Sequence, residues 1–177
     1  MSVSVIVLAA GKGTRMKSDL PKVLHKVLGK PLLAHALDKL SFIENQYVVV
    51  GHGLDMVINS LPSSTKHILQ KVQLGTGHAV ATVVSDDLFV ENKSEFTVVV
   101  PGDVPAIDSK NIELLISEVE TKSSPVGFLT AIVDNPYGYG RIVRNNEEIR
   151  IVEEKDCSDG ERAVSYTHLT LPTICSV

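Results

Sequence analysis

Short apolar runs alternate with helix-patterned segments along most of this chain. Residues 3–9 are almost continuously β-branched or apolar, a pattern typical of a strand buried on both faces. Similar runs predict strands at 47–50, 67–69, 96–100 and 126–133, and apolar residues at helical spacing predict helices at 32–40, 54–61, 76–88 and 112–119. This alternation indicates parallel strands joined by right-handed crossovers.

The predicted fold class is therefore α/β, a doubly wound, mostly parallel open sheet with helices on both faces. Residues 142–143 and 149–152 predict a more exposed, antiparallel addition to it. Ligands of doubly wound sheets bind beyond the carboxyl ends of the strands. Two unusual loops, 10–15 and 101–105, fall at such ends, so we expect the functional site there.

Composition and charge limit the classes of protein to which this chain can belong. The 177 residues suit a single domain, and 44% hydrophobic with 21% charged residues is the balance of an ordinary globular protein. A net charge of -4 argues against a nucleic-acid binder, which would carry a clustered basic face. Any polyanionic ligand must therefore be held by a local site.

Neither the cysteines nor the N-terminus points to secretion. Cys157 and Cys175 cannot form a disulfide framework and have no nearby partners for zinc. The apolar N-terminal run lacks the basic region of a signal peptide and is too short to span a bilayer. We expect a cytoplasmic protein without an integral membrane segment.

The first chemical signal is the glycine loop after the first strand. Gly11 and Gly13 allow the backbone to approach phosphates, with amide N–H groups as donors. Lys12, Arg15 and Lys22 place three cations within eleven positions, as a triphosphate requires. A tight turn with solvated lysines is the alternative, and it would be preferred for a bare GxG.

Two common glycine motifs do not fit this loop. The dinucleotide-binding motif needs a third glycine where Met16 stands, and the P-loop spacing with its Gly-Lys-Ser/Thr is absent. A nicotinamide-dependent oxidoreductase is therefore a distant alternative.

A second glycine-containing segment lies at residues 70–79. Gly75 and Gly77 permit close approach, and Thr76 can cap the helix that begins there. The free N–H groups of a helix N-terminus can receive an anion or a polar base edge. Taken alone, the segment is equally consistent with a simple capped helix entry.

An aspartate follows the strand at 96–100. Asp103 stands in Pro-Gly-Asp-Val-Pro at the carboxyl end of that strand, where a carboxylate beside a triphosphate is well placed for Mg²⁺. A polar turn is the alternative. Because phosphate binding is already indicated, we favour metal binding by Asp103.

Four blocks together resemble a known family. L-A-A-G-x-G-T-R-M with a following L-P-K is similar to the signature of nucleotidyltransferases that activate sugar phosphates. With Q-L-G-T-G-H-A, G-D-V-P, and the N-P-x-G-Y-G-R-I and I-V-E-x-K-D stretches, residues 3 to 156 resemble the bifunctional N-acetylglucosamine-1-phosphate uridyltransferase / glucosamine-1-phosphate acetyltransferase family. By itself, the last pair of stretches is consistent with a plain hairpin.

The resemblance implies a reaction and its residues. UTP and N-acetylglucosamine-1-phosphate would give UDP-N-acetylglucosamine and pyrophosphate, with Mg²⁺ on Asp103 and charge neutralised by Arg15 and Lys22 as catalytic residues. Sugar contacts are implied for Gly140 and Glu153, and His78 is interpreted as a surface or packing residue. The implied nucleotide contacts are Leu8, Ala9, Ala10, Gly11, Gly13, Lys22, Gln70, Gly75 and Thr76.

The resemblance stops before the chain does. Residues 1–163 are interpreted as a partial sugar-nucleotidyltransferase domain, and 164–177 as an anomalous, truncated or foreign tail that does not continue the sheet pattern. A genuine loop and strand is the alternative for residues 164–177. The β-helical acetyltransferase half, through which the family assembles, is missing, so we expect a monomer that acetylates nothing. Two alternatives stay open: a nucleotidyltransferase for another sugar-1-phosphate, and a non-catalytic nucleotide-binding fragment.

Overall fold

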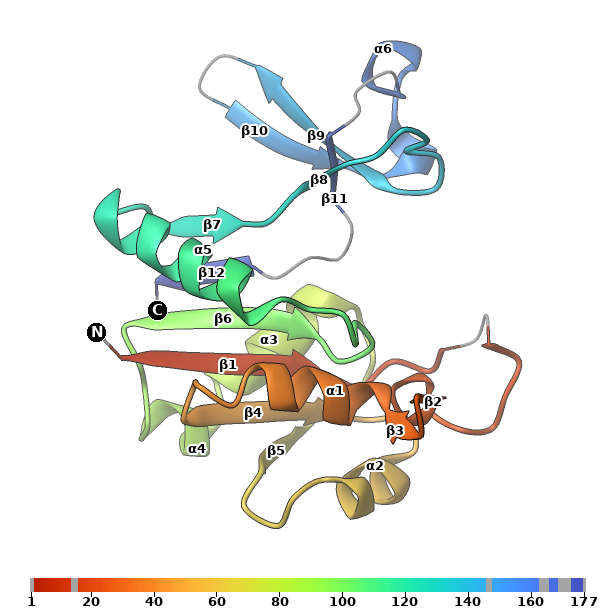
Figure 1. Cartoon of the computed structure of the whole chain (residues 1–177), viewed down its shortest axis with the longest axis vertical. Coiled ribbons are helices and arrows are strands. Elements are labelled where there is room, and N and C mark those ends of the chain that lie inside the picture. The colour runs from red at the N-terminus through yellow and green to blue at the C-terminus, as the bar shows by residue number, and fades with distance from the viewer. Residues whose placement is uncertain (1, 14–15, 146–147, 163–165, 169–172, 177) are drawn as a thin grey trace. The chain divides into compact units, whose positions relative to one another are not determined.

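The structure is a computed structural model that describes residues 2–13, 16–145, 148–162, 166–168 and 173–176 (Figure 1). The chain forms two compact units, one from residues 1–127 and 172–177 and the other from residues 128–171. We call them unit 1 and unit 2.

Unit 1 is built on a six-stranded sheet with the order β5-β4-β1-β6-β12-β7. Strand β1 pairs in parallel with β4 and β6, and β4 pairs in parallel with β5. These pairings confirm the predicted doubly wound, mostly parallel sheet. Its strands are β1 (Val3–Leu8), β4 (Asn45–Val50), β5 (Lys66–Leu69), β6 (Phe96–Pro101), β7 (Val126–Phe128) and β12 (Thr173–Ser176).

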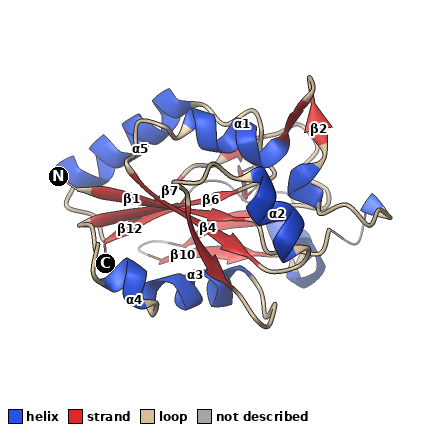
Figure 2. Ribbon diagram, turned by 90° about the horizontal axis from the view of Figure 1, so that it is seen from below, coloured by secondary structure: helices blue, strands red, loops and turns tan. Residues whose placement is uncertain are grey.

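Helices cover both faces of this sheet. Figure 2 shows α1 and α5 on one face and α3 and α4 on the other. The helix predicted at 76–88 is divided in two because the side chain of Asp86 accepts a hydrogen bond from Leu88 N and starts a new helix. The helical elements of unit 1 are η2 (Lys22–Leu24), α1 (Leu32–Lys39), α2 (Leu54–Ser60), α3 (Thr76–Val84), α4 (Asp87–Val90) and α5 (Ser109–Thr121).

The core forms because the central strands are apolar on both sides. Val5, Ile6 and Val7 are completely buried, which confirms the interpretation of the first apolar run. One face of the sheet packs against α3, whose Ala79 and Val83 join a cluster with strand residues Ile6, Tyr47, Val49 and Ile68. Burial of this kind is the main force that stabilises the sheet.

Two elements of unit 1 were not expected from the sequence. A small antiparallel hairpin, β2 (Lys26–Val27) and β3 (Lys30–Pro31), turns through Leu28 and Gly29, both at positive φ. Strand β12 pairs antiparallel with β6, and its Ile174 is completely buried. Residues 173–176 therefore do continue the sheet, in agreement with the alternative interpretation of this segment as a loop and strand. The origin of that segment and the boundary at residue 163 stay predictions.

Unit 2 carries a four-stranded sheet with the order β10-β9-β11-β8. Strands β9 and β10 pair antiparallel, as predicted for residues 142–143 and 149–152. The strand predicted at 126–133 is interrupted between β7 and β8. The elements of unit 2 are β8 (Ala131–Ile132), β9 (Gly140–Asn145), β10 (Glu148–Val152), η3 (Glu154–Asp156), α6 (Asp159–Arg162) and β11 (Tyr166–His168).

Cys157 and Cys175 are free thiols. Within the described residues, no helix has the length and apolar character needed to cross a membrane.

Candidate nucleotide site at the carboxyl edge of the sheet

Four parallel strands of unit 1 end at the same edge of the sheet. The register pairs Leu8 with Val49 and with Pro101, and it pairs Val50 with Leu69. The loops that follow β1, β4, β5 and β6 therefore emerge side by side. This is the edge at which doubly wound sheets bind ligands.

The glycine loop leaves β1 in contact with both neighbouring strands. Ala9 N donates a hydrogen bond to Val49 O at 2.9 Å, and Gly102 N donates to Leu8 O at 2.9 Å. These bonds fix the start of the loop between the ends of β4 and β6. A Cβ placed on Gly11 would have no atom within 4 Å, so the backbone is open at this position.

Lys22 and Asp103 are brought together although 81 positions separate them, because Lys22 Nζ forms an ion pair with Asp103 Oδ2. Both side chains remain partly exposed.

Two glycines leave room for the segment that carries Lys22. A Cβ on Gly13, which has φ +58°, would lie 2.7 Å from Lys22 Cβ, and a Cβ on Gly53, which has φ +66°, would lie 2.3 Å from Pro21 Cγ. Two glycines therefore permit the Pro21–Lys22 segment to lie where it does.

Gln70 lies in the loop after β5 and is 3% exposed. Its backbone N donates to Val50 O at 2.8 Å, and its side-chain Nε2 lies 3.3 Å from Gly75 O and 2.9 Å from His78 Nδ1. Gly75, at φ 112°, is the N-cap of α3 and provides no side chain. The expectation that Thr76 caps this helix is therefore wrong, because Thr76 is already the first residue inside it.

Two residues of this edge are not predicted as site residues from the sequence. Gly51 follows β4 directly, and a Cβ there would lie 2.8 Å from Gln73 Nε2 and 3.0 Å from Ala10 Cβ. A glycine immediately after a buried strand was the available signal. His78, for which the sequence predicts a surface or packing role, is half-buried, and its Nδ1 also faces the Gln70 amide.

The structure thus gathers the glycine loop, Lys22, Gln70, Gly75, Thr76 and Asp103 in unit 1, while Arg15 lies outside the described residues. Their roles in binding and catalysis stay predictions. The described residues include no group of three or more His, Cys, Asp or Glu side chains that would hold a metal ion. Asp103 by itself suits Mg²⁺, which commonly takes one or two carboxylates and completes its coordination with water and substrate phosphates.

Unit 2 places the two predicted sugar-binding residues next to each other. A Cβ on Gly140 would lie 3.8 Å from Glu153 Oε1. Glu153 is exposed and lines a surface cavity of about 500 Å³ together with Tyr137, Glu154, Lys155 and Arg162.

The neighbouring carboxylate, Glu154, holds the loop before β9 in place. Its Oε2 accepts hydrogen bonds from Arg141 Nη2 at 2.7 Å and from Gly138 N at 3.2 Å, and Arg141 is 2% exposed. Removal from water raises the pKa of Glu154, but these bonds and the charges of Arg141 and Arg162 outweigh it and hold the pKa below its ordinary value. The carboxylate of Glu154 is therefore occupied by bonds within the chain, whereas the exposed carboxylate of Glu153 can accept hydrogen bonds from a ligand.

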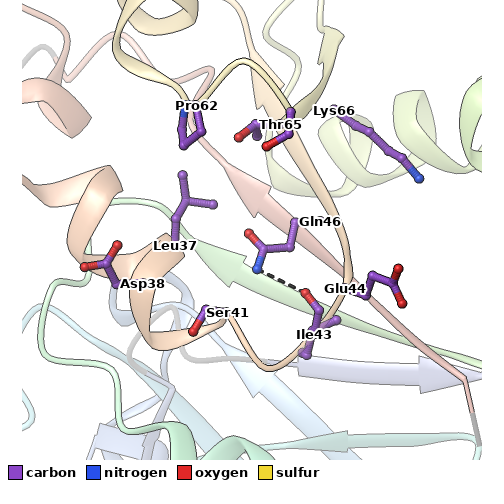
Figure 3. Close-up of a pocket in the computed structure, with 10 residues that line it drawn as sticks. Leu37, Asp38, Ser41, Ile43, Glu44, Gln46, Pro62, Thr65 and Lys66 are labelled. Carbon is purple, nitrogen blue, oxygen red and sulfur yellow. Dashed lines mark hydrogen bonds between the residues drawn. The ribbon is translucent and has the colours of Figure 1, made fainter.

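Unit 1 also contains a cavity of about 330 Å³ where β4 begins (Figure 3). The amide of Gln46, on its wall, is already engaged, because Nε2 donates to Leu40 O at 2.8 Å and to Ile43 O at 3.1 Å. The lining carries two carboxylates, Asp38 and Glu44, against one cation, Lys66, whose Nζ already donates to Asn45 Oδ1 at 3.2 Å. This cavity therefore does not suit a nucleotide. It is lined by Leu37, Asp38, Ser41, Ile43, Glu44, Gln46, Pro62, Ser64, Thr65 and Lys66.

Comparison with known proteins finds related sequences along most of the chain. The family model of the MobA-like NTP transferase domain matches residues 5–146. Over 169 residues, 93% of the chain, the sequence is 47% identical to the Bifunctional protein GlmU of Lactococcus lactis subsp. lactis (strain IL1403), of which it covers 36%. It is 45% identical over 162 residues, 92% of the chain, to the Bifunctional protein GlmU of Fervidobacterium nodosum, of which it covers 35%. The chain thus spans about a third of the length of these relatives.

Solved structures agree on the fold. UDP-glucose pyrophosphorylase from Acinetobacter baumanii superposes with a TM-score of 0.76 at 17% identity, over 99% of this chain and 75% of that one. HddC from Yersinia pseudotuberculosis superposes with a TM-score of 0.72 at 20% identity, over 99% and 77% of the two chains. At these identities the likeness concerns the fold alone.

Proposed function

Because the chain belongs to the family of nucleotidyltransferases with a MobA-like NTP transferase domain, we propose that it transfers the uridylyl group of UTP to N-acetylglucosamine-1-phosphate. The products are UDP-N-acetylglucosamine and pyrophosphate. The observation that carries the proposal is the Lys22–Asp103 ion pair beside the glycine loop, at the strand edge that also holds Gln70. The choice of UTP and of the amino sugar rests on the resemblance of the four sequence blocks.

The sugar phosphate supplies its own nucleophile. A phosphate monoester oxygen is anionic at neutral pH, so attack on the α-phosphorus of UTP needs no general base. The obstacles are repulsion between two polyanions and their alignment for in-line displacement. The chain must therefore supply positive charge and fixed donors at the α-phosphate.

Lys22 and the glycine loop suit this task. Lys22 Nζ is held at the sheet edge by Asp103, and a triphosphate bound over the loop would compete for the same ammonium group. Backbone N–H groups at Gly11 and Gly13 would donate to phosphate oxygens. Asp103 would then be free to hold Mg²⁺, which, when bound with the triphosphate, neutralises charge on the phosphates and on the leaving pyrophosphate.

Release of pyrophosphate tests the proposal directly. The purified chain is mixed with Mg²⁺, UTP and either N-acetylglucosamine-1-phosphate or glucose-1-phosphate, and pyrophosphate is measured by a coupled assay. Faster release with the amino sugar supports the proposal, whereas faster release with glucose-1-phosphate would assign the chain to another sugar. Tight UTP binding without any release would leave a nucleotide-binding fragment and overturn the catalytic assignment.

A further inference from the structure

The Gln70 amide is held in one orientation by two acceptors. Gly75 O receives Gln70 Nε2 at 3.3 Å and also the first helical hydrogen bond of α3, from Ala79 N at 3.1 Å. A carbonyl oxygen can only accept, so the group of Gln70 that faces it must be the amide nitrogen. The other proton of that nitrogen points to His78 Nδ1, 2.9 Å away.

This arrangement sets the tautomer of His78. Because Nε2 of Gln70 donates, His78 Nδ1 must carry a lone pair, and the ring proton must reside on Nε2 of the imidazole. With both amide protons used, the Gln70 side chain keeps only its oxygen for a ligand. No described residue donates a hydrogen bond to Gln70 Oε1.

We propose that His78 is a positioning residue that fixes the Gln70 amide with its oxygen toward the base, so that the site favours uracil over cytosine. Uracil carries an N–H at ring position 3 and needs an acceptor, whereas cytosine has a bare nitrogen there and needs a donor. An amide free to rotate offers either group, but an amide locked by His78 and Gly75 offers only the acceptor. This inference rests on the proposed uridylyl transfer, since it explains how that nucleotide is selected.

Replacing the imidazole separates positioning from simple packing. His78→Phe keeps a ring of similar size but has no acceptor, whereas His78→Asn keeps an acceptor close to the position of Nδ1. His67→Phe, on exposed His67 of β5, is the matched control. Calorimetric titrations with UTP and with CTP, in Mg²⁺, give the ratio of the two affinities for each chain.

We expect the preference for UTP over CTP to fall roughly three- to tenfold in His78→Phe, the value of one hydrogen bond. His78→Asn and His67→Phe should keep the wild-type ratio. An unchanged ratio in folded His78→Phe would overturn the inference alone, as would an equal loss of UTP and CTP affinity in both His78 variants. A wild-type chain without preference for UTP would instead overturn the proposed function and this inference with it.

The tautomer supplies a second measurement that needs no ligand. A long-range ¹H–¹⁵N spectrum of the free chain should show His78 with an unprotonated Nδ1 and a proton on Nε2 at a pH where the ring is neutral. The His78→Phe spectrum identifies the signals. A proton on Nδ1 would overturn the inference whatever the nucleotide preference.

Discussion

Lys22 and Asp103 form an ion pair in the free chain, so a bound phosphate would compete for the ammonium group and Mg²⁺ for the carboxylate. The pair is partly exposed, and an ion pair of this kind contributes little to stability, about 0 to 1 kcal/mol. Its importance is that it keeps a cation and a carboxylate at the edge where phosphates and Mg²⁺ would meet. A second lysine–aspartate pair, Lys30 with Asp38, provides a matched control in the same unit.

Replacing Lys22 should affect turnover more than substrate binding. We expect Lys22→Ala to lower kcat by about 100-fold, because it removes a charged donor from the transition state. The KM for the sugar phosphate should change little. Initial-rate kinetics measure both parameters, with Lys30→Ala as the control that should behave as wild type. Equal and small effects on kcat and KM would remove Lys22 from its assigned role.

Replacing Asp103 should affect the metal requirement. Asp103→Asn preserves shape but loses the charge that attracts Mg²⁺, and loss of even an outer partner of a metal ligand costs about 10- to 100-fold in affinity. We therefore expect the Mg²⁺ concentration for half-maximal rate to rise at least about tenfold. Asp38→Asn should leave the Mg²⁺ titration unchanged. If Asp103→Asn titrates like wild type, Asp103 is not the ligand.

At the scale of elements, strands and helices with a periodic apolar pattern could be predicted from the sequence. Elements and contacts that depend on residues distant in the sequence could not. The continuous apolar run of β1 and the helical spacing of α1 are local signals, and both elements occur as predicted. Strand β12 is short and lies between β6 and β7, which are distant from it in the sequence, so its own residues carry no comparable signal. The Gln70–His78 contact depends on how β5 and α3 meet, which no local pattern reveals.

The η2 segment should be sensitive to the glycine that faces it. Gly53→Ala introduces a Cβ that would lie 2.3 Å from Pro21 Cγ, whereas Gly29→Ala, also at positive φ, meets nothing within 4 Å. Both substitutions have the left-handed backbone cost of about 1 to 2 kcal/mol. The overpacking at Gly53 should lower the free energy of unfolding by a further 1 to 3 kcal/mol, roughly. Urea unfolding compares the two variants, and equal losses would show that Pro21 moves aside freely.

The glutamate network of unit 2 should weaken in acid. Glu154 has a lowered pKa, so it stabilises the folded state above the ordinary glutamate pKa of about 4.3, and this stability is lost as the pH falls through the lower folded value. In wild type, the thermal unfolding midpoint should therefore decrease as the pH is lowered below about 4.3. In Glu154→Gln this decrease should be smaller. Exposed Glu148→Gln is the control and should follow wild type. Parallel curves for wild type and Glu154→Gln would contradict the assignment.

At the scale of the whole molecule, the two sets of predicted ligand residues belong to different units. The proposed nucleotide residues lie in unit 1, and Gly140 and Glu153 lie in unit 2. The proposed nucleotide and metal residues come from three sequence blocks, and the two sugar residues come from the fourth. The proposed function therefore assigns UTP to one unit's residues and the amino sugar to the other's.

This division predicts that a mutation in unit 2 changes the KM for the sugar phosphate without changing the Kd for UTP. Glu153→Ala removes a carboxylate that would accept hydrogen bonds from the sugar, so the KM for N-acetylglucosamine-1-phosphate should rise about tenfold or more. The Kd for UTP should stay unchanged. Glu148→Ala, an exposed glutamate of β10, is the control. A parallel weakening of UTP binding would contradict the separate assignment.

The proposed function requires that the carboxyl edge of unit 1 bind UTP. The most direct test is a calorimetric titration of the whole chain, shown by circular dichroism to be folded, with UTP, CTP, GTP and ATP in the presence of Mg²⁺. We expect UTP to bind most tightly and Gln70→Ala to lose most of this preference. Equal binding of all four nucleotides, or no binding of UTP by the folded chain, would contradict the proposed function.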